Sequence, residues 1–415
     1  MKYNTYTLDN GLRIIHLPSD SQVVYCGYQI NAGTRDEEPG EEGLAHFCEH
    51  VTFKGTEHRK AWHILNCLES VGGELNAYTN KEGTVYYSAI LKEHIARAVD
   101  LLSDIVFHSV YPQAEIDKEV EVICDEIESY NDSPAELIYD EFENILFQGS
   151  PLGHNILGTA EQVRAFKTED ALRFTRKLYR PDNAIFFAYG DIDFKKLVKL
   201  LTLNFEHGTL NFTNTPKTNH KDQTSNLNVQ SYLGKTIVMQ KNTHQAHVMI
   251  GCRAYDVHDE RRMPLYLLNN ILGGPGMNAK LNLALREHNG LVYTVESTMV
   301  AYGDTGTWSI YFGCDEHDVK RCLRLVRKEL DKLMQKPLSD SQLRAAKKQI
   351  KGQIGVACDN RENFALDMGK SFLHYGWEKN VDRFYEQVDA ITAQQMQAVA
   401  KELFDKDHLT TLIFK

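Results

Sequence analysis

The chain has 415 residues, of which 42% are hydrophobic and 25% charged, and its formal net charge is −11. This composition is typical of a soluble globular protein, and the length predicts two domains. No block of Lys or Arg suggests a nucleic-acid partner, and no apolar run is long enough for a transmembrane helix. The N-terminal residues lack the apolar segment of a signal peptide. The eight Cys are scattered, without a C-x-x-C pair, which predicts a reduced cytoplasmic location.

In the first half, two short strands are expected between Thr5 and Leu17, around the turn Asp9-Asn10-Gly11, because Asx-Gly turns join antiparallel strands. Alternating apolar positions predict four more strands, over residues 23–30, 74–80, 84–91 and 183–190. Helical periodicity predicts a helix after Gly43 and further helices over residues 62–71, 93–107, 114–130, from 135 onward, 161–179 and 194–203.

The helix after Gly43 carries the pattern His-x-x-Glu-His, formed by His46, Glu49 and His50. These residues share one helical face, so two imidazoles one turn apart can hold a single Zn²⁺ ion. The Glu49 carboxylate then lies beside the open coordination position, where it can take a proton from an attacking water. The pattern therefore indicates metal-assisted hydrolysis, and the alternative is a surface helix with two unrelated histidines. Cys48 points away from this face and is expected in the core.

A third protein ligand is expected downstream, because catalytic zinc usually has three. In the acidic helix predicted over residues 114–130, Glu119 and Glu126 are seven apart and share a face, and Glu121 and Glu128 form a second such pair. Spacing alone does not choose among the four, and solvated helix charges are the ordinary alternative.

Residues 206–230 are rich in Asn, Thr and Lys and are predicted to be a linker. They separate a first domain, 1–205, from a second, 231–415. The second half reads as a faded copy of the first, with a strand at 248–252, helices at 265–274, 315–334 and 339–355, and a strand at 409–414. In this alignment Leu265, Leu268 and Asn269 stand where the His-x-x-Glu-His residues stand, so the copy carries no zinc chemistry.

Helices that alternate with runs of neighbouring strands predict an α+β fold. Each of the two homologous domains is expected to be a mostly antiparallel sheet packed with helices.

Three motifs occur in order: H-F-C-E-H-V-T-F-K-G-T from His46, G-G-E-L-N-A-Y-T from Gly72, and the pair Glu119 and Glu126. Together they resemble the family of pitrilysin, insulin-degrading enzyme and mitochondrial processing peptidase, over the chain from Leu8 to the C-terminus. In that family the third zinc ligand is the second of two Glu spaced by seven. The resemblance therefore implies Glu126 as a ligand and Glu119 as a catalytic-site residue that orients a ligand.

The resemblance also implies substrate contacts. Leu285 to Tyr293 is similar to a second-half motif of the family in which an Arg and a Tyr reach the substrate, here Arg286 and Tyr293. A phenol can stabilise an oxyanion and a guanidinium can bind peptide carbonyls. The strand from Gly73 to Thr79 is implied beside the metal, where Asn76 is a candidate contact to the substrate backbone. The alternatives are an ordinary surface Arg, a half-buried Tyr and a purely structural strand.

The expected function is that of a zinc metalloendopeptidase with one Zn²⁺ per chain, acting on peptides or unfolded segments, with Glu49 as general base. At 47.4 kDa the chain resembles the half-size members, in which two chains enclose a chamber. A homodimer is expected, and the alternatives are the catalytic subunit of a heterodimeric processing peptidase and a non-catalytic scaffold subunit. Neither nucleic acid nor a membrane is expected as a partner.

Overall fold

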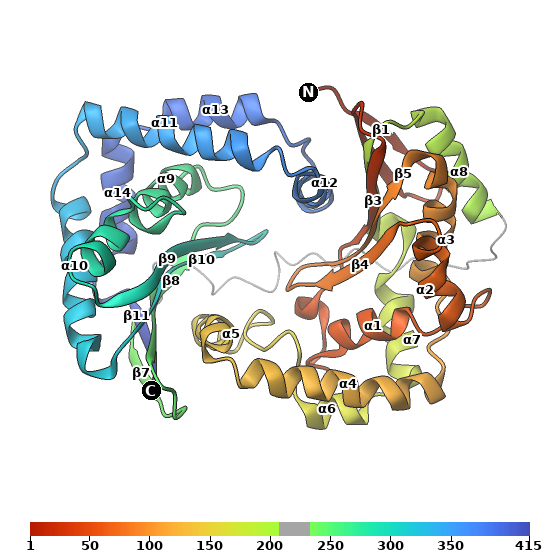
Figure 1. Cartoon of the computed structure of the whole chain (residues 1–415), viewed down its shortest axis with the longest axis horizontal. Helices are drawn as coiled ribbons and strands as arrows, with labels where there is room; N and C mark the ends of the chain where they lie inside the picture. Colours follow the sequence, from red (N-terminus) through yellow and green to blue (C-terminus); the bar gives the residue numbers. More distant parts are fainter. Residues whose placement is uncertain (207–232) are drawn as a thin grey trace. The chain divides into compact units, whose positions relative to one another are not determined.

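The computed structural model describes residues 1–206 and 233–415 (Figure 1). The predicted linker, 206–230, therefore lies almost wholly outside the described residues. Two compact units account for the described chain. The first contains residues 1–129, 154–206 and 358–379, and the second contains residues 130–153, 233–357 and 380–415. Each unit has its own sheet and its own hydrophobic core.

The sheet of the first unit has six strands in the order β1-β2-β6-β3-β5-β4. Only β2 and β6 pair in parallel, and all other neighbours are antiparallel. Strand β4 lies at one edge of the sheet. The strand bounds are Asn4–Thr7 (β1), Arg13–Pro18 (β2), Val23–Ile30 (β3), Glu74–Thr79 (β4), Thr84–Leu91 (β5) and Ala184–Gly190 (β6).

The sheet of the second unit repeats this topology with five strands in the order β7-β11-β8-β10-β9. Its only parallel pair, β7 with β11, occupies the position of β2 with β6. The matching order of five strands agrees with the two homologous α+β domains predicted from the sequence. The strand bounds are Thr236–Met239 (β7), Ala246–Ala254 (β8), Val292–Ala301 (β9), Gly306–Cys314 (β10) and Thr410–Phe414 (β11).

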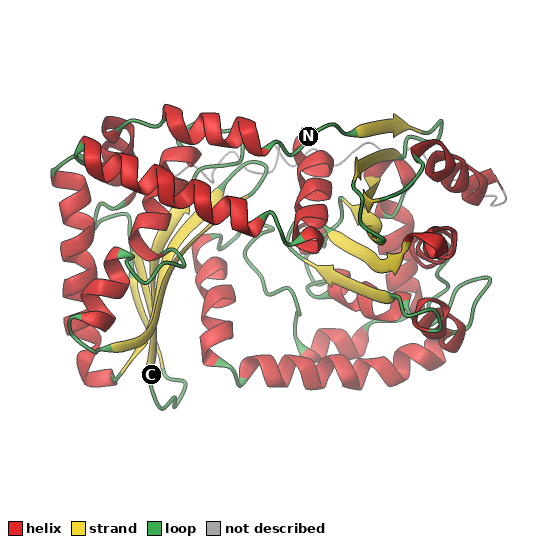
Figure 2. Cartoon of the chain, turned by 45° about the horizontal axis from the view of Figure 1, so that its top comes forward, coloured by secondary structure: helices red, strands yellow, loops and turns green. Residues whose placement is uncertain are grey.

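Helices flank both sheets (Figure 2). In chain order they are α1 (Leu44–Thr52), α2 (Ala61–Glu69), α3 (Ile95–Phe107), α4 (Gln113–Asn131), α5 (Pro134–Leu146), α6 (Ala160–Ala165), α7 (Thr168–Leu178), α8 (Phe194–Glu206), α9 (Arg262–Gly273), α10 (Val319–Gln335), α11 (Asp340–Ala357), α12 (Arg361–Lys370), α13 (Val381–Ala390) and α14 (Ala393–Leu403). The segments Asn282–Glu287 and Ser371–Tyr375 are π-helical.

One predicted helix, 161–179, is wrong as a single element, because the structure divides it into α6 and α7. Phe166 between them is extended, with φ −66° and ψ 142°, and its buried ring packs 5.3 Å from that of Phe47. The Asp170 carboxylate then accepts the backbone N–H of Lys167 at 2.9 Å and caps the second helix. The continuous helix is therefore interrupted at Phe166, where burial of the aromatic ring and capping of α7 take the place of one helical turn.

Two helices cross between the halves of the sequence. Helix α5, from the first half, packs on β8 and β11 of the second unit through Leu137, Ile138 and Phe142. Helix α12, from the second half, packs on β3 and β6 of the first unit, where Gln29 donates to the Leu366 carbonyl at 2.8 Å. The predicted domain ranges 1–205 and 231–415 therefore differ from the two compact units, because each unit includes a segment of the other range.

All eight Cys side chains are free thiols, and Cys48 is fully buried, as its position on α1 predicts. Within residues 1–206 and 233–415, every helix is too short or too polar to cross a membrane.

Candidate metal centre

Helix α1 is held in place at its N-terminus by a buried carboxylate. Gly43 precedes the helix with φ +94°, and a Cβ there would lie 2.7 Å from the Leu157 carbonyl oxygen, so only glycine fits. The Glu37 carboxylate accepts the backbone N–H groups of Gly43 at 3.1 Å and Ala45 at 2.8 Å. His154 contacts the same carboxylate at 2.8 Å through Nε2. This arrangement satisfies the helix donors and fixes the direction in which α1 presents its polar face.

On that face, His46 and His50 lie one turn apart, with ring centroids 4.6 Å from each other. Glu126 of α4 completes the group: its Oε2 lies 3.2 Å from His50 Nε2 and 3.8 Å from His46 Nε2. Candidate ligand atoms of the three residues all lie within 4.8 Å of one another. The structure therefore chooses Glu126, and neither Glu121 nor Glu128, as the carboxylate that meets the two imidazoles.

The group fits zinc in chemistry and in size. Two imidazole nitrogens and one carboxylate oxygen are the ligand set of catalytic zinc sites. Bonds of 2.0–2.2 Å in a tetrahedron separate the ligand atoms by about 3.3 Å, which lies between the two distances from Glu126. His46 Nδ1 is buried without a hydrogen-bond partner among the described residues. Within residues 1–206 and 233–415 one other such group occurs, Asp315, His317 and Asp318, and it is mostly solvent-exposed and comes from a single turn.

Glu119 supports this group without joining it. One carboxylate oxygen lies 3.1 Å from His50 Nδ1, and the other accepts from Lys54 Nζ at 2.6 Å. A carboxylate on the second nitrogen of a metal-binding imidazole fixes its tautomer and orientation. Because both side chains are only partly exposed, the Lys54 ammonium group also keeps the Glu119 carboxylate charged.

Glu49 lies on α1 between the two histidines, and its carboxylate accepts a hydrogen bond from the Thr79 hydroxyl at 2.6 Å. Burial raises the pKa of Glu49, and the Thr79 hydrogen bond and the charge of His50 oppose this rise. Thr79 ends β4, the edge strand, and so links the strand to the carboxylate. A partly desolvated carboxylate held by one hydroxyl is suited to accept and return a proton.

The two imidazoles differ in their affinity for protons. Burial lowers the pKa of His46 to about 4, with a further contribution from the charge of His50. Burial also opposes the charged form of His50, but hydrogen bonds to Glu119 and Glu126 outweigh it and raise the pKa to about 9. A metal ion bound at His50 would have to displace this proton, because a metal-binding imidazole must be deprotonated.

The three predicted substrate residues lie outside the group formed by His46, His50 and Glu126. Asn76 is solvent-exposed in β4, opposite Tyr87 of β5. Arg286 and Tyr293 belong to the second unit, where the guanidinium carbon lies 5.7 Å from the centre of the phenol ring. Both line a cavity of about 480 Å³, and Tyr293 is 83% exposed. The structure thus brings Arg286 and Tyr293 together as neighbours.

Reasoning from the sequence assigned no role to Thr79, Lys54, Glu37 or His154. Thr79 and Lys54 lie within the motifs that carry the family resemblance. Their place in these motifs is the signal that could have identified them as site residues. Glu37 and His154 are 117 residues apart, and no local pattern predicts their contact.

In the second unit, the counterpart of α1 is α9. Leu265 and Leu268 are buried in the core, and the Asn269 side chain accepts a hydrogen bond from Ser297 at 2.6 Å. In helix α9, the three positions that bear the metal motif in α1 therefore serve packing and a structural hydrogen bond.

Two duplicated sheets packed with helices, together with a His-x-x-Glu-His helix and a distant Glu, define a class of zinc peptidase. The family description Insulinase (Peptidase family M16) matches residues 14–160, and Peptidase M16 inactive domain matches residues 165–350. The chain belongs to this family. The first match includes the His-x-x-Glu-His helix and Glu126, and the match to the inactive domain includes α9.

Relatives of similar length support the assignment. The chain is 31% identical to the uncharacterized zinc protease YmxG of Bacillus subtilis (strain 168), over 98% of this chain and 97% of the relative. It is 32% identical to the uncharacterized zinc protease SCO5738 of Streptomyces coelicolor, over 96% and 87%. Zn²⁺ is therefore the cofactor of the chain.

Solved structures share the fold. A protease from Helicobacter pylori superposes with a TM-score of 0.91 at 21% identity, covering 100% of this chain and 99% of that one. A peptidase M16 inactive domain from Pseudomonas fluorescens superposes with a TM-score of 0.87 at 16% identity, covering 100% and 98%.

Proposed function

We propose that the chain is a cytoplasmic zinc endopeptidase that hydrolyses peptides or unfolded segments, with Glu49 as its general base. The observation that carries the proposal is the Glu49 carboxylate, which is held by Thr79 at 2.6 Å beside the converging His46, His50 and Glu126. A scaffold protein has no need for a polar, partly buried carboxylate at that place, because burial of such a group costs free energy.

In this proposal, His46, His50 and Glu126 hold the metal, and Glu119 keeps the His50 imidazole in its binding tautomer. Zinc, when bound, lowers the pKa of water and polarises a carbonyl. Glu49 takes the proton of the attacking water and delivers it to the leaving amine.

Residues further from the metal bind the substrate. Tyr293 donates a hydrogen bond to the developing oxyanion, and Arg286 binds peptide carbonyls. Strand β4 has one unpaired edge, so an extended peptide can add to it through main-chain hydrogen bonds. Asn76 then contacts the peptide backbone. Recognition through the main chain favours flexible substrates of varied sequence, which a dimeric chamber would enclose.

Bound zinc and peptide cleavage, measured on the same preparation, test the function. We expect about one zinc per chain and cleavage of an internally quenched peptide that a chelator abolishes and added zinc restores. A pure protein that binds zinc stoichiometrically but cleaves only after a homologous chain is added would be the catalytic subunit of a heterodimer. A metal-free, inert protein would be a scaffold and would contradict the proposal.

The site is proposed to be shared between two chains, with the metal residues of one chain and Tyr293 of its partner. In a C₂ dimer there are then two composite sites. Glu49→Gln and Tyr293→Phe homodimers should each be impaired at both sites. After subunit exchange about half of the dimers are mixed, and each mixed dimer has one intact site, so about a quarter of all sites should regain full activity.

Activity above the mean of the two separate variants is the expected result of this mixing experiment. Exchange is verified independently with two chains of different mass. If exchange is complete and activity stays at that mean, the site is built within one chain or Tyr293 has no catalytic role.

A further inference from the structure

The cavity beside Arg286 and Tyr293 contains one further charged side chain, that of Glu296. This cavity of about 480 Å³ is lined by residues of α9, of the π-helical segment Asn282–Glu287 and of the edge strand β9. Of the described residues that line it, Arg286 is the one cation and Glu296 the one carboxylate. The other lining side chains are uncharged, so these two residues determine which charge the cavity accepts.

Glu296 has an anchor but no counter-ion. Its Oε1 accepts a hydrogen bond from the Tyr139 phenol of α5, and in the described parts of the chain it forms no ion pair with a Lys, Arg or His. The Arg286 guanidinium is not its partner, because it lies 5.7 Å from the centre of the Tyr293 ring and 3.9 Å from the Glu287 carboxylate. The Glu296 carboxylate is only partly exposed, so its charge is not fully screened by solvent.

Tyr139 holds this carboxylate in one place. Burial, followed by the hydrogen bond to Glu296, raises the pKa of the Tyr139 phenol, so the phenol stays protonated and remains a donor. Its ring packs 5.3 Å from that of Tyr311, which lies directly opposite Glu296 on the neighbouring strand β10. A carboxylate fixed in this way loses little conformational freedom when it binds a cation.

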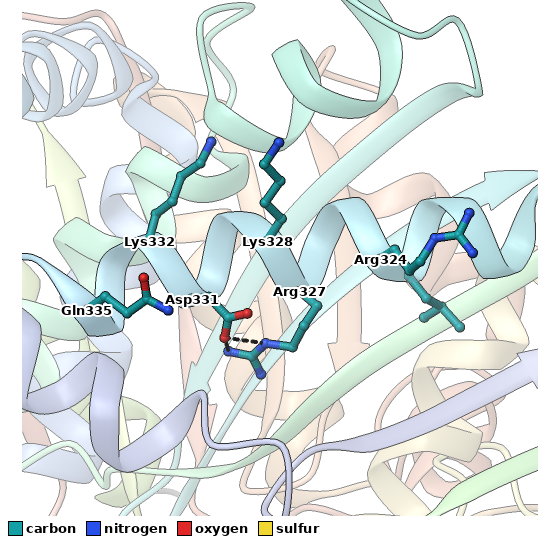
Figure 3. A pocket seen from close by; sticks show the side chains of 7 residues that line it. Arg324, Arg327, Lys328, Asp331, Lys332 and Gln335 are labelled. Atoms are coloured by element: carbon teal, nitrogen blue, oxygen red, sulfur yellow. Dashed lines mark hydrogen bonds and ion pairs between the residues drawn. The ribbon is translucent and has the colours of Figure 1, made fainter.

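A second surface cavity of this unit carries the opposite charge (Figure 3). The groove on α10, of about 700 Å³, is lined by Arg324, Arg327, Lys328 and Lys332, and among the described lining residues Asp331 is the one acid. Figure 3 shows that Asp331 is already bound by Arg327, at 2.8 Å. A cationic ligand is therefore repelled by this groove, in contrast to the cavity on β9.

We propose that Glu296 binds a Lys or Arg side chain of the peptide and so helps to select the bond that is cleaved. The inference rests on the proposed function, in which Tyr293 contacts the reacting carbonyl. Glu296 follows Tyr293 by three residues on β9, which corresponds to about 10 Å. The basic residue is therefore expected within about three positions of the cleaved bond. The net charge of −11 attracts basic peptides in the same sense at longer range.

A purely structural role for Glu296 would require less. Tyr139 needs one acceptor, which the amide of a Gln side chain also provides. A partly buried carboxylate costs more desolvation free energy than such an amide, and a bound cation offsets that cost. The charge of Glu296, which the contact with Tyr139 does not explain, is accounted for by a basic ligand.

Paired peptides test the inference. Each internally quenched peptide carries one Arg at a chosen position near the cleaved bond, and its partner carries citrulline there, which has nearly the same shape without the charge. At the preferred position, the zinc-loaded wild-type protein should cleave the Arg peptide with a kcat/KM about 10- to 100-fold higher. Glu296→Gln should reduce this ratio to about one, because the charge is lost. Glu296→Arg should favour Glu over Gln at the same position.

Tyr139→Phe tests the anchor, and Glu386→Gln is the matched control. Loss of the phenol should lower the ratio of Arg to citrulline cleavage part of the way, whereas general damage to the fold would lower both rates and leave the ratio unchanged. Glu386 is an exposed acid on α13 outside the cavity, so its variant should keep the wild-type ratio. Mass spectrometry of the products confirms that each pair is cleaved at the same bond.

Three outcomes contradict the inference. If the wild-type protein cleaves both members of every pair equally, or if Glu296→Gln keeps the preference, Glu296 does not select the substrate and the peptidase function stands. If acetylation of the peptide N-terminus removes the effect of Glu296 and citrulline does not, the carboxylate binds the α-ammonium group instead. If the zinc-loaded chain cleaves no peptide, alone or with a homologous chain, the proposed function fails and this inference fails with it.

Discussion

The Glu49→Gln variant should retain zinc and lose peptide hydrolysis by about 10²- to 10⁴-fold, the range for removal of a positioned general base. Glu49 is not among the three residues whose ligand atoms converge, and its carboxylate is held by Thr79 at 2.6 Å. A glutamine has nearly the same shape and can keep a hydrogen bond to the Thr79 hydroxyl. The variant therefore removes the proton acceptor and leaves the metal group intact.

The measurements are zinc content by atomic spectroscopy and cleavage of a quenched peptide. Glu69→Gln, at the exposed end of α2, is the matched control and should behave as the wild type in both. Near wild-type turnover by Glu49→Gln, with zinc retained, would show that another group accepts the proton.

Zinc affinity should fall far more in Glu126→Gln than in Glu119→Gln. Glu126 Oε2 lies within 3.2 and 3.8 Å of the two imidazole nitrogens, so its loss removes one of three ligands. Glu119 contacts only the distal Nδ1 of His50, at 3.1 Å, and the loss of such an orienting carboxylate costs roughly 10–100-fold. Competition with a chromogenic chelator gives the two affinities.

Glu121→Gln and Glu128→Gln complete this experiment as controls, because both residues lie on α4 and both were candidates by spacing. Each should bind zinc as the wild type does. If Glu119→Gln releases the metal and Glu126→Gln keeps it, the roles of the two carboxylates are exchanged.

The metal group was largely predictable from the sequence because its chemistry is local. His46, Glu49 and His50 lie within one and a half turns of helix, and the 3.6-residue period alone places them on one face. The third ligand was not predictable in this way. Helical spacing left Glu119, Glu121, Glu126 and Glu128 open, and the choice depends on how α4 packs against α1. The family resemblance, and then the packing, single out Glu126.

The first sheet was predictable because alternation and the Asx-Gly turn identified all six of its strands. In the second sheet only the strands at 248–252 and 409–414 were predicted, and β7, β9 and β10 were missed. Which helix packs on which sheet could not be predicted from the sequence. The amphipathic faces of α5 and α12 predict burial but do not specify against which sheet, since apolar contacts carry little directional information. Phe166 likewise has an apolar side chain inside a helical pattern, and only its contact with Phe47 shows why the helix breaks there.

The exchange of α5 and α12 has a consequence for synthesis of the chain on the ribosome. Domains of a multidomain protein ordinarily fold in turn as they emerge, the N-terminal one first. Here the first sheet needs residues 361–370 to cover β3 and β6, and these residues emerge when nearly nine-tenths of the chain has been made. The face of the first sheet that α12 covers therefore stays open until most of the second half has been translated, whereas the main core of this unit is formed by residues 8–201 alone.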